Sequence, residues 1–181
     1  RIDGAGNLIG RYEGHKPGAP ALIIGSHLDS VYDAGLYDGP LGVLLGIECV
    51  AALQAADLRM PYAIEVVAFG DEEGSRFPIS LICSRAMAGT LTDRDLTVTD
   101  GGGKTPEQAM QLFREWVFRP MHNIDPRSAA RRPEDVLAYL DPHIEHGPVL
   151  QAEDLAVGVV TGIAGQLRFE VQVTVAAGHA G

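Results

Sequence analysis

The sequence predicts an α/β fold in which a mixed central sheet is flanked by helices. Two continuous apolar runs, residues 21–25 and 62–69, have the length and β-branched content of strands that are buried on both faces. Between them, residues 41–56 form an apolar segment with few helix breakers, which indicates a long helix. A strand-helix-strand order places both strand ends at one edge of the sheet, where ligands of such folds bind.

The other elements are assigned by the same patterns. Residues 2–12 indicate a strand pair around a glycine turn, and residues 156–163 and 167–176 indicate an antiparallel pair. Residues 141–145 suit a short strand or strand end. Charged or glycine-rich loops are expected at 70–77 and 96–104, and helices at 79–91, 106–117 and 133–140, the last with Pro133 at its first turn.

Composition excludes several classes of protein. The 181 residues are 46% apolar and 21% charged, which is typical of a globular domain with a core. A net charge of −10 argues against a nucleic-acid partner. No apolar run approaches the roughly 20 residues that span a bilayer, so we expect no membrane partner. Cys49 and Cys83 form no CxxC pair and are expected to be buried in a reducing compartment, so we expect a cytoplasmic protein.

The first candidate metal ligand is His27, which follows the apolar run at 21–25. A single histidine at such a place is more often structural. Asp29, however, lies two residues further on, and side chains at this spacing share a face in an extended segment. A carboxylate there can hold one ring nitrogen and leave the other for a metal, although Asp29 could instead cap a turn.

Acidic residues and a second histidine follow at the ends of later segments. Asp38 precedes the helix at 41–56, where it is either a bridging carboxylate or an N-cap. Glu72 and Glu73 follow the strand at 62–69, in a turn that is either solvated or divides the roles of general base and metal ligand. His143 adds the further nitrogen that a zinc site of nitrogen and oxygen ligands requires.

Five segments, in this order, resemble one family over nearly the whole chain. They are GSHLDSV (25–31), YDGPLGV (37–43), DEEGSRF (71–77), HIEHGPVL (143–150) and GIAGQ (162–166). The chain is similar to the zinc-dependent amidohydrolases that include N-carbamoyl-L-amino-acid hydrolase, allantoate amidohydrolase and β-ureidopropionase. These belong to the dinuclear aminopeptidase/carboxypeptidase superfamily, so the resemblance implies a metallopeptidase-like catalytic domain.

The resemblance implies a centre of two divalent metal ions. His27 and His143 are then ligands of one metal, Asp38 bridges both, and Glu73 is a ligand of the second metal. We expect Zn²⁺, with Mn²⁺, Co²⁺ or Ni²⁺ as alternatives. The family supplies its last metal ligand, a histidine, and a substrate-binding arginine from a C-terminal stretch. We expect both to lie beyond Gly181, in a longer protein of which this chain is a segment.

The resemblance also assigns catalytic roles. Glu72 is the general base that activates water, Asp29 orients His27, and His179 helps to polarise the scissile carbonyl, often across a dimer interface. Two positions depart from the family pattern. Gly178 stands where asparagine is usual before His179, and His146 stands where glutamine is usual.

We therefore expect a truncated catalytic metal-binding domain at 1–160 and the first strands of an α+β lid and dimerisation domain at 161–181. The expected reaction is metal-dependent hydrolysis of a linear amide or ureido C–N bond in a small molecule, either an N-carbamoyl-L-amino acid or allantoate, by a homodimer. Two alternatives stay open: a dipeptidase or aminoacylase of the same superfamily, and a non-catalytic fragment that lacks the C-terminal metal ligand.

Overall fold

A computed structural model of the chain describes residues 1–117, 125–165, 169, 171–174 and 178. The chain divides into two compact units, Arg1–Ile144 and Glu145–Gly181, and each is described by itself. The first unit contains the central sheet together with most of the predicted site residues.

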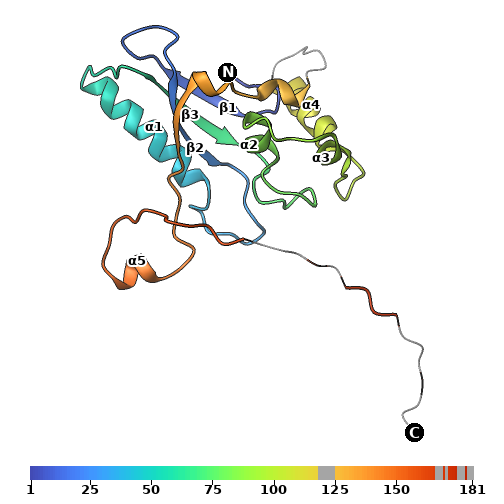
Figure 1. Cartoon of the computed structure of the whole chain (residues 1–181). Helices are drawn as coiled ribbons and strands as arrows, with labels where there is room; N and C mark the ends of the chain where they lie inside the picture. Colours follow the sequence, from blue (N-terminus) through green and yellow to red (C-terminus); the bar gives the residue numbers. More distant parts are fainter. Residues whose placement is uncertain (118–124, 166–168, 170, 175–177, 179–181) are drawn as a thin grey trace. The chain divides into compact units, whose positions relative to one another are not determined.

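A four-stranded mixed sheet forms the centre of the first unit (Figure 1). Its strand order is β1-β3-β2-β4, in which β2 is parallel to both β3 and β4, and β1 is antiparallel to β3. The predicted mixed α/β sheet is confirmed. The strands are β1 (Leu8–Tyr12), β2 (Ala21–His27), β3 (Ala63–Phe69) and β4 (Val136–Leu140).

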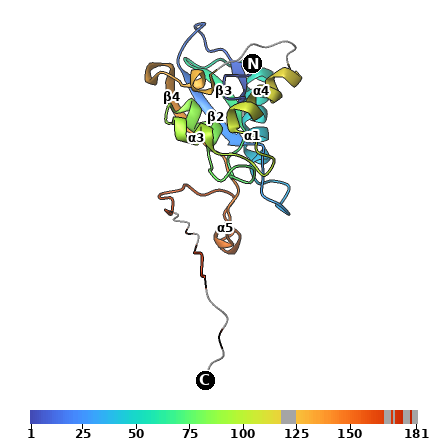
Figure 2. The ribbon, with the colours of Figure 1, turned by 90° about the vertical axis from the view of Figure 1, so that its right-hand side faces the viewer.

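Helices lie on both faces of this sheet. In Figure 1, α1 lies on one side of the strands and α2, α3 and α4 lie on the other, and Figure 2 shows the latter group nearer the viewer. The helices are α1 (Pro40–Ala55), α2 (Ile82–Met87), α3 (Asp93–Thr97) and α4 (Pro106–Val117), with short 3-10 turns η1 (Pro126–Ala129) and η2 (Pro133–Asp135).

The core follows from the alternation of side chains along β3. Val66 and Ala68 pack with Val43 of α1 on one face. Val67 and Phe69 point to the opposite face, where they pack in a cluster that reaches α2. Every residue of β3 is buried, as the continuous apolar run predicts for a strand that is covered on both faces.

The connections of the chain place a switch point at β2. From β2 the chain crosses through α1 to β3 on one side, and later returns to β4 on the other side of β2. In open α/β sheets the crevice at such a point, outside the carboxyl ends of the strands, is where ligands bind. His27 is the last residue of β2 and therefore lies at that position.

One predicted helix is wrong. Residues 133–140 form the short turn η2 followed by the strand β4, which pairs with β2 from Ala21 to Ile24. Leucine and alanine favour helix locally, but pairing with a buried neighbouring strand outweighs that weak preference. Two smaller differences are that α2 is shorter than the predicted 79–91, and that α3 ends inside the predicted loop at 96–104.

The second unit contains the short helix α5 (Val149–Ala152). The Glu145 carboxylate accepts hydrogen bonds from the backbone N–H groups of Val149 and Leu150, at 3.0 and 2.9 Å. The strand predicted at 156–163 is wrong, because these residues are exposed and without regular structure, and alternation makes a strand only where a partner covers one face. The strand predicted at 167–176 lies partly outside the described residues, and its described residues form no strand.

The cysteines differ in exposure. Cys83 in α2 is buried as predicted, whereas Cys49 on the outer face of α1 is exposed, which corrects the expectation for that residue. Among the described residues, no helix combines the length and the apolar character needed to cross a membrane.

Candidate metal centre

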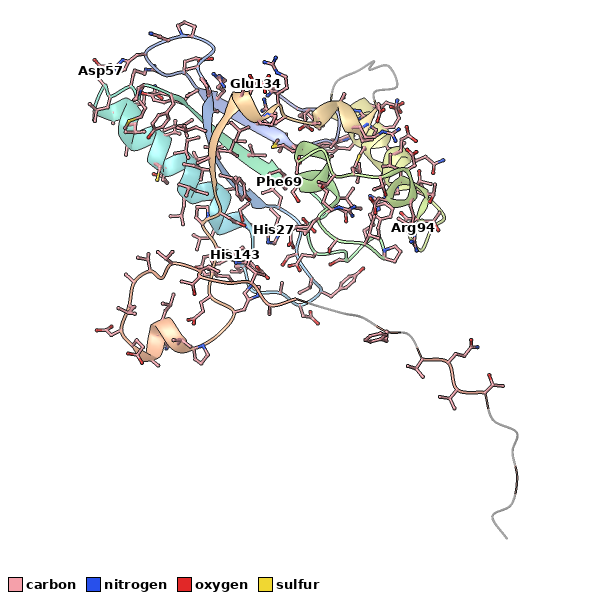
Figure 3. All side chains as sticks on the ribbon, viewed as in Figure 1. His27, Asp57, Phe69, Arg94, Glu134 and His143 are labelled. Carbon is pink, nitrogen blue, oxygen red and sulfur yellow. The ribbon has the colours of Figure 1, made fainter. Side chains whose placement is uncertain are left out.

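The polar residues that follow the three parallel strands meet at one edge of the sheet. His27 ends β2, Glu72 follows β3 by three residues, and His143 follows β4 by three residues. Figure 3 shows His27 and His143 next to each other below Phe69, the last residue of β3. The predicted convergence of strand ends is therefore present, and β4 adds a third end to the two that the sequence identified.

The His27 ring is fixed by two contacts. The ring is buried, and its Nδ1 lies 2.6 Å from the backbone carbonyl oxygen of Asp29. A carbonyl can only accept, so Nδ1 carries a proton, and in the neutral ring Nε2 then presents a lone pair. Gly39 lies against the ring with a φ of +85°, and a Cβ there would be 2.5 Å from Nδ1. Glycine is needed at this place both for the left-handed backbone and for the close approach.

His143 and Asp38 bring two further ligand atoms to the same place. Nδ1 of His143 lies 2.9 Å from the carbonyl oxygen of Ile144, which again leaves the lone pair on Nε2. The two Nε2 atoms are 3.3 Å apart. Asp38 Oδ1 lies 3.9 Å from Nε2 of His27 and 3.5 Å from Nε2 of His143. Three atoms that carry lone pairs thus converge, an arrangement that a cation between them stabilises.

These distances fit a zinc ion. Nitrogen and oxygen ligands about 2.0–2.1 Å from a tetrahedral Zn²⁺ lie about 3.3–3.4 Å from each other. The Nε2 to Nε2 separation of 3.3 Å matches this ligand-to-ligand distance, and the Asp38 oxygen would have to move by about half an ångström toward His27. His27, Asp38 and His143 can therefore serve as three ligands of one divalent ion.

The acidic turn after β3 supplies a second possible ligand group. One ligand atom from each of His27, Glu72 and Glu73 lies within 4.8 Å of the others. Burial raises the pKa of Glu72, an effect that the nearby His27 opposes. Burial also raises the pKa of Asp71, to about 6, and the charge of Asp29 adds to this rise. Several carboxylates in a partly buried turn lose hydration and repel one another. A bound cation offsets both costs, so this turn suits a cation site.

The contact of Asp29 differs from the expected one. The sequence led us to expect its carboxylate on the His27 ring, but the bonded atom is its backbone carbonyl, and Oδ1 is 3.9 Å from Nδ1. The carboxylate instead accepts hydrogen bonds from the backbone N–H groups of Glu72, at 3.0 Å, and Glu73, at 3.1 Å. Both carboxylate oxygens are engaged by the turn, which explains why the ring is held by the backbone.

A small cavity of about 80 Å³ opens beside the two histidines. Glu72 lines it together with Tyr139 and Asp141, two residues that no sequence pattern indicated. The Tyr139 hydroxyl donates to the carbonyl of Gly25, and burial raises the pKa of Tyr139. Asp141 comes directly after β4. A correct strand prediction there would have marked Asp141 as a polar residue at a strand end, as it did for His27.

One predicted site residue cannot be placed. His179 lies outside the described residues, and its role stays a prediction. The other six, His27, Asp29, Asp38, Glu72, Glu73 and His143, all lie in the first unit.

Comparison with known proteins defines the class. Residues 23–180 match the model of peptidase family M20/M25/M40, and the chain belongs to this family. The match includes the strand end at His27, the acidic turn and His143.

Individual relatives are more specific. The chain is 47% identical to an N-carbamoyl-L-amino acid amidohydrolase of Geobacillus stearothermophilus, over 99% of this chain and 42% of that protein. It is 40% identical to a probable allantoate deiminase of Oryza sativa subsp. japonica, over 99% of this chain and 36% of that protein. These proteins bear out the predicted amidohydrolase resemblance. The chain spans less than half the length of either.

A solved structure agrees with the fold. The crystal structure of a hydantoinase/carbamoylase family amidase from Burkholderia ambifaria matches with a TM-score of 0.72 and 34% identity. The match covers 84% of this chain and 35% of the amidase. It supports the description of the first unit as a metallopeptidase-like α/β domain.

Proposed function

We propose that this chain carries the catalytic part of a metal-dependent amidohydrolase. The reaction is hydrolysis of a linear amide or ureido C–N bond, with N-carbamoyl-L-amino acids or allantoate as substrates. The convergence of Nε2 of His27, Nε2 of His143 and a carboxylate oxygen of Asp38 is the observation that carries the proposal. Glu72, beside the same cavity, provides a group that can accept a proton.

The proposed cofactor is a pair of divalent metal ions, with Zn²⁺ favoured because the ligands are nitrogen and oxygen atoms and the two imidazole nitrogens are at tetrahedral spacing. His27, Asp38 and His143 would hold the first ion, and by the family resemblance Asp38 and Glu73 would hold the second. When bound, such an ion makes water acidic enough to lose a proton near neutral pH and polarises the carbonyl. The chain's own residues must then move that proton and hold the substrate.

Glu72 is the proposed general base. It takes a proton from water as the water oxygen bonds to the ureido carbon, and it returns the proton to the leaving nitrogen as the C–N bond breaks. An N-carbamoyl amino acid thereby gives the free amino acid and carbamate, which decomposes to carbon dioxide and ammonia. His179 donates to the carbonyl oxygen, where negative charge develops.

The remaining features of the proposal rest on the family resemblance. Residues 161–181 begin a lid domain, through which the protein forms a homodimer. We place the protein in the cytoplasm, and the partner is the small substrate alone. The amidohydrolase and allantoate deiminase relatives support a ureido substrate. A dipeptidase or aminoacylase activity is the second candidate, favoured by membership of a peptidase family.

A substrate panel tests the proposal on the longest natural protein that contains these residues. After loading with Zn²⁺ or Mn²⁺, we expect ammonia from N-carbamoyl-L-amino acids or allantoate and little cleavage of dipeptides or N-acyl amino acids. Ammonia from no ureido acid would contradict the proposal, and dipeptide cleavage instead would favour the second candidate.

A matched pair of variants tests the role of Glu72. Glu72→Gln should lower kcat by roughly 10²- to 10⁴-fold while metal content stays unchanged, because it removes a proton acceptor and keeps the shape. Glu48→Gln, on the exposed face of α1, removes the same charge and should leave kcat unchanged. An unchanged kcat in Glu72→Gln would exclude Glu72 as the base.

A further inference from the structure

We propose that Asp29 is a positioning residue that joins the two halves of the metal centre. Its backbone carbonyl sets the His27 tautomer, and its carboxylate sets the backbone of the Glu72-Glu73 turn. The catalytic meaning of this arrangement rests on the proposed function, but the arrangement itself can be tested in the chain without metal or substrate.

The carboxylate is fully committed to the turn. Oδ1 accepts from the Glu72 N–H at 3.0 Å and Oδ2 accepts from the Glu73 N–H at 3.1 Å. Hydrogen bonds to an ionised carboxylate are about twice as strong as neutral ones, and two parallel bonds fix orientation as well as distance. The separation of 3.9 Å from Oδ1 to Nδ1 of His27 is too long for a hydrogen bond. The carboxylate therefore orients the glutamates, and the carbonyl orients the histidine.

The loop after β2 runs along the loop after β3 on either side of Asp29. The Leu28 N–H donates to the carbonyl of Phe69 at 2.9 Å. The Ser75 hydroxyl donates to the carbonyl of Ser30 at 3.3 Å. Asp29 lies between these two links, so the pair of bonds from its carboxylate continues the contact between β2 and β3 beyond the end of the sheet.

The turn is held independently from its other side. The carbonyls of Asp71 and Glu72 accept from the N–H groups of Ile82, at 3.2 Å, and Leu81, at 2.8 Å. Asp71 has a φ of 53°, a left-handed conformation that needs support from its surroundings. Because these contacts do not involve Asp29, the turn should persist without the Asp29 carboxylate, but the Glu72 and Glu73 amides would each lose an acceptor.

This arrangement matters for the proposed reaction because the rate depends on how precisely the general base Glu72 lies relative to the metal ligands. Displacement of a reacting group by about 1 Å can cost about a hundredfold in rate. Glu72 and Glu73 come from the loop after β3 and His27 from the end of β2, and Asp29 is hydrogen-bonded to all three. Asp29 thus fixes their relative positions without any contact of its own with the substrate.

Asp29→Asn separates this role from direct orientation of the ring. The asparagine amide group keeps one acceptor oxygen but opposes the second N–H with an NH₂ donor. Asp33→Asn is the matched control, because Asp33 lies in the same loop, is exposed, and has a φ of 58° that asparagine tolerates. Both variants remove one negative charge.

Nuclear magnetic resonance of the metal-free chain gives the decisive readouts. In Asp29→Asn we expect the amide proton signal of Glu72 or Glu73 to move upfield. The same proton should exchange with solvent at least about tenfold faster, which corresponds to a loss of roughly 1.4 kcal/mol in the free energy that protects it from exchange. The ¹⁵N shifts of His27 should still report a proton on Nδ1. Asp33→Asn should change none of these signals.

The opposite pattern would overturn the inference: a changed His27 tautomer with unchanged Glu72 and Glu73 amides. If Asp29→Asn does not fold, the wild-type chain still decides. Scalar coupling across the hydrogen bonds from the Glu72 and Glu73 nitrogens to Cγ of Asp29 is expected, and its absence at both residues would contradict the assignment. These readouts do not depend on activity, so failure of the proposed function and failure of this inference can be told apart.

Discussion

Nε2 of His27 lies 3.3 Å from Nε2 of His143, although 116 positions separate the two residues in the chain. The cause is the parallel pairing of β2 with β4, which brings their carboxyl ends to the same edge of the sheet. Each ring directs Nδ1 at a backbone carbonyl, so in its neutral form each presents a lone pair on Nε2. The backbone therefore prepares the metal-binding form of both histidines.

The close approach of Gly39 to the His27 ring gives the first prediction. Gly39→Ala should weaken both folding and metal binding, because its Cβ would be 2.5 Å from Nδ1 of His27 in a backbone with a φ of +85°. The left-handed conformation alone costs alanine roughly 1–2 kcal/mol. Urea unfolding and a Zn²⁺ titration measure the two effects. Gly35→Ala is the control, since a Cβ there meets nothing within 4 Å. Equal stability and affinity in the two variants would refute the described packing.

The ion pairs of a buried glutamate in the strand β3 give the second prediction. Glu65 in β3 is buried and pairs with Arg11, its cross-strand neighbour in β1, at 3.1 Å and with Arg131. Arg1 also lies 3.8 Å from the Glu65 carboxylate. Glu65→Ala should lower the free energy of unfolding by about 3 kcal/mol, the lower end for a broken buried pair, because the arginines that lose their partner are partly exposed.

The control for these ion pairs is Glu134→Ala. Glu134 pairs with Arg132 on the surface, with 64% of its side chain exposed, so its removal should change stability little. Chemical denaturation with both variants decides. Similar midpoints would mean that the Glu65 ion pairs contribute no more than a surface ion pair.

The two cysteines should differ in reactivity, which is the third prediction. Burial raises the pKa of the Cys83 thiol to about 12, and its Sγ–H donates to the carbonyl of Ala5. The thiolate is the reactive form, so Cys83 should not react near pH 8, whereas the exposed Cys49 should. A thiol reagent should modify one cysteine in the native chain and both after denaturation. Cys49→Ser should abolish the native reaction; its persistence would show that Cys83 is accessible.

The sequence was sufficient for the parts of the site that local patterns define. Continuous apolar runs located β2 and β3, so His27 and Glu72 could be placed at strand ends. β4 was missed because Pro133 and the following leucines and alanine resemble the start of a helix, and only its pairing with β2 makes it a strand. The amide contacts of Asp29 could not be foreseen, because they depend on how two separate loops lie against each other. The pairing of Arg131 with Glu65 was missed for the same reason.

The central claim is that His27, Asp38 and His143 together bind a metal ion, and the metal content of this chain tests it most directly. After equilibrium dialysis against Zn²⁺, elemental analysis should find about one firmly held ion per wild-type chain, bound by His27, Asp38 and His143. The second proposed ion, with only Asp38 and Glu73 named as its ligands, should be lost more readily. His27→Ala and His143→Ala should each weaken binding by at least tenfold to a hundredfold, roughly the loss that even outer contacts produce. His15→Ala should bind as the wild type does, because His15 is exposed and precedes the amino end of β2, whereas His27 lies at its carboxyl end. A folded wild-type chain that retains no zinc, or equal retention in all variants, would contradict the account.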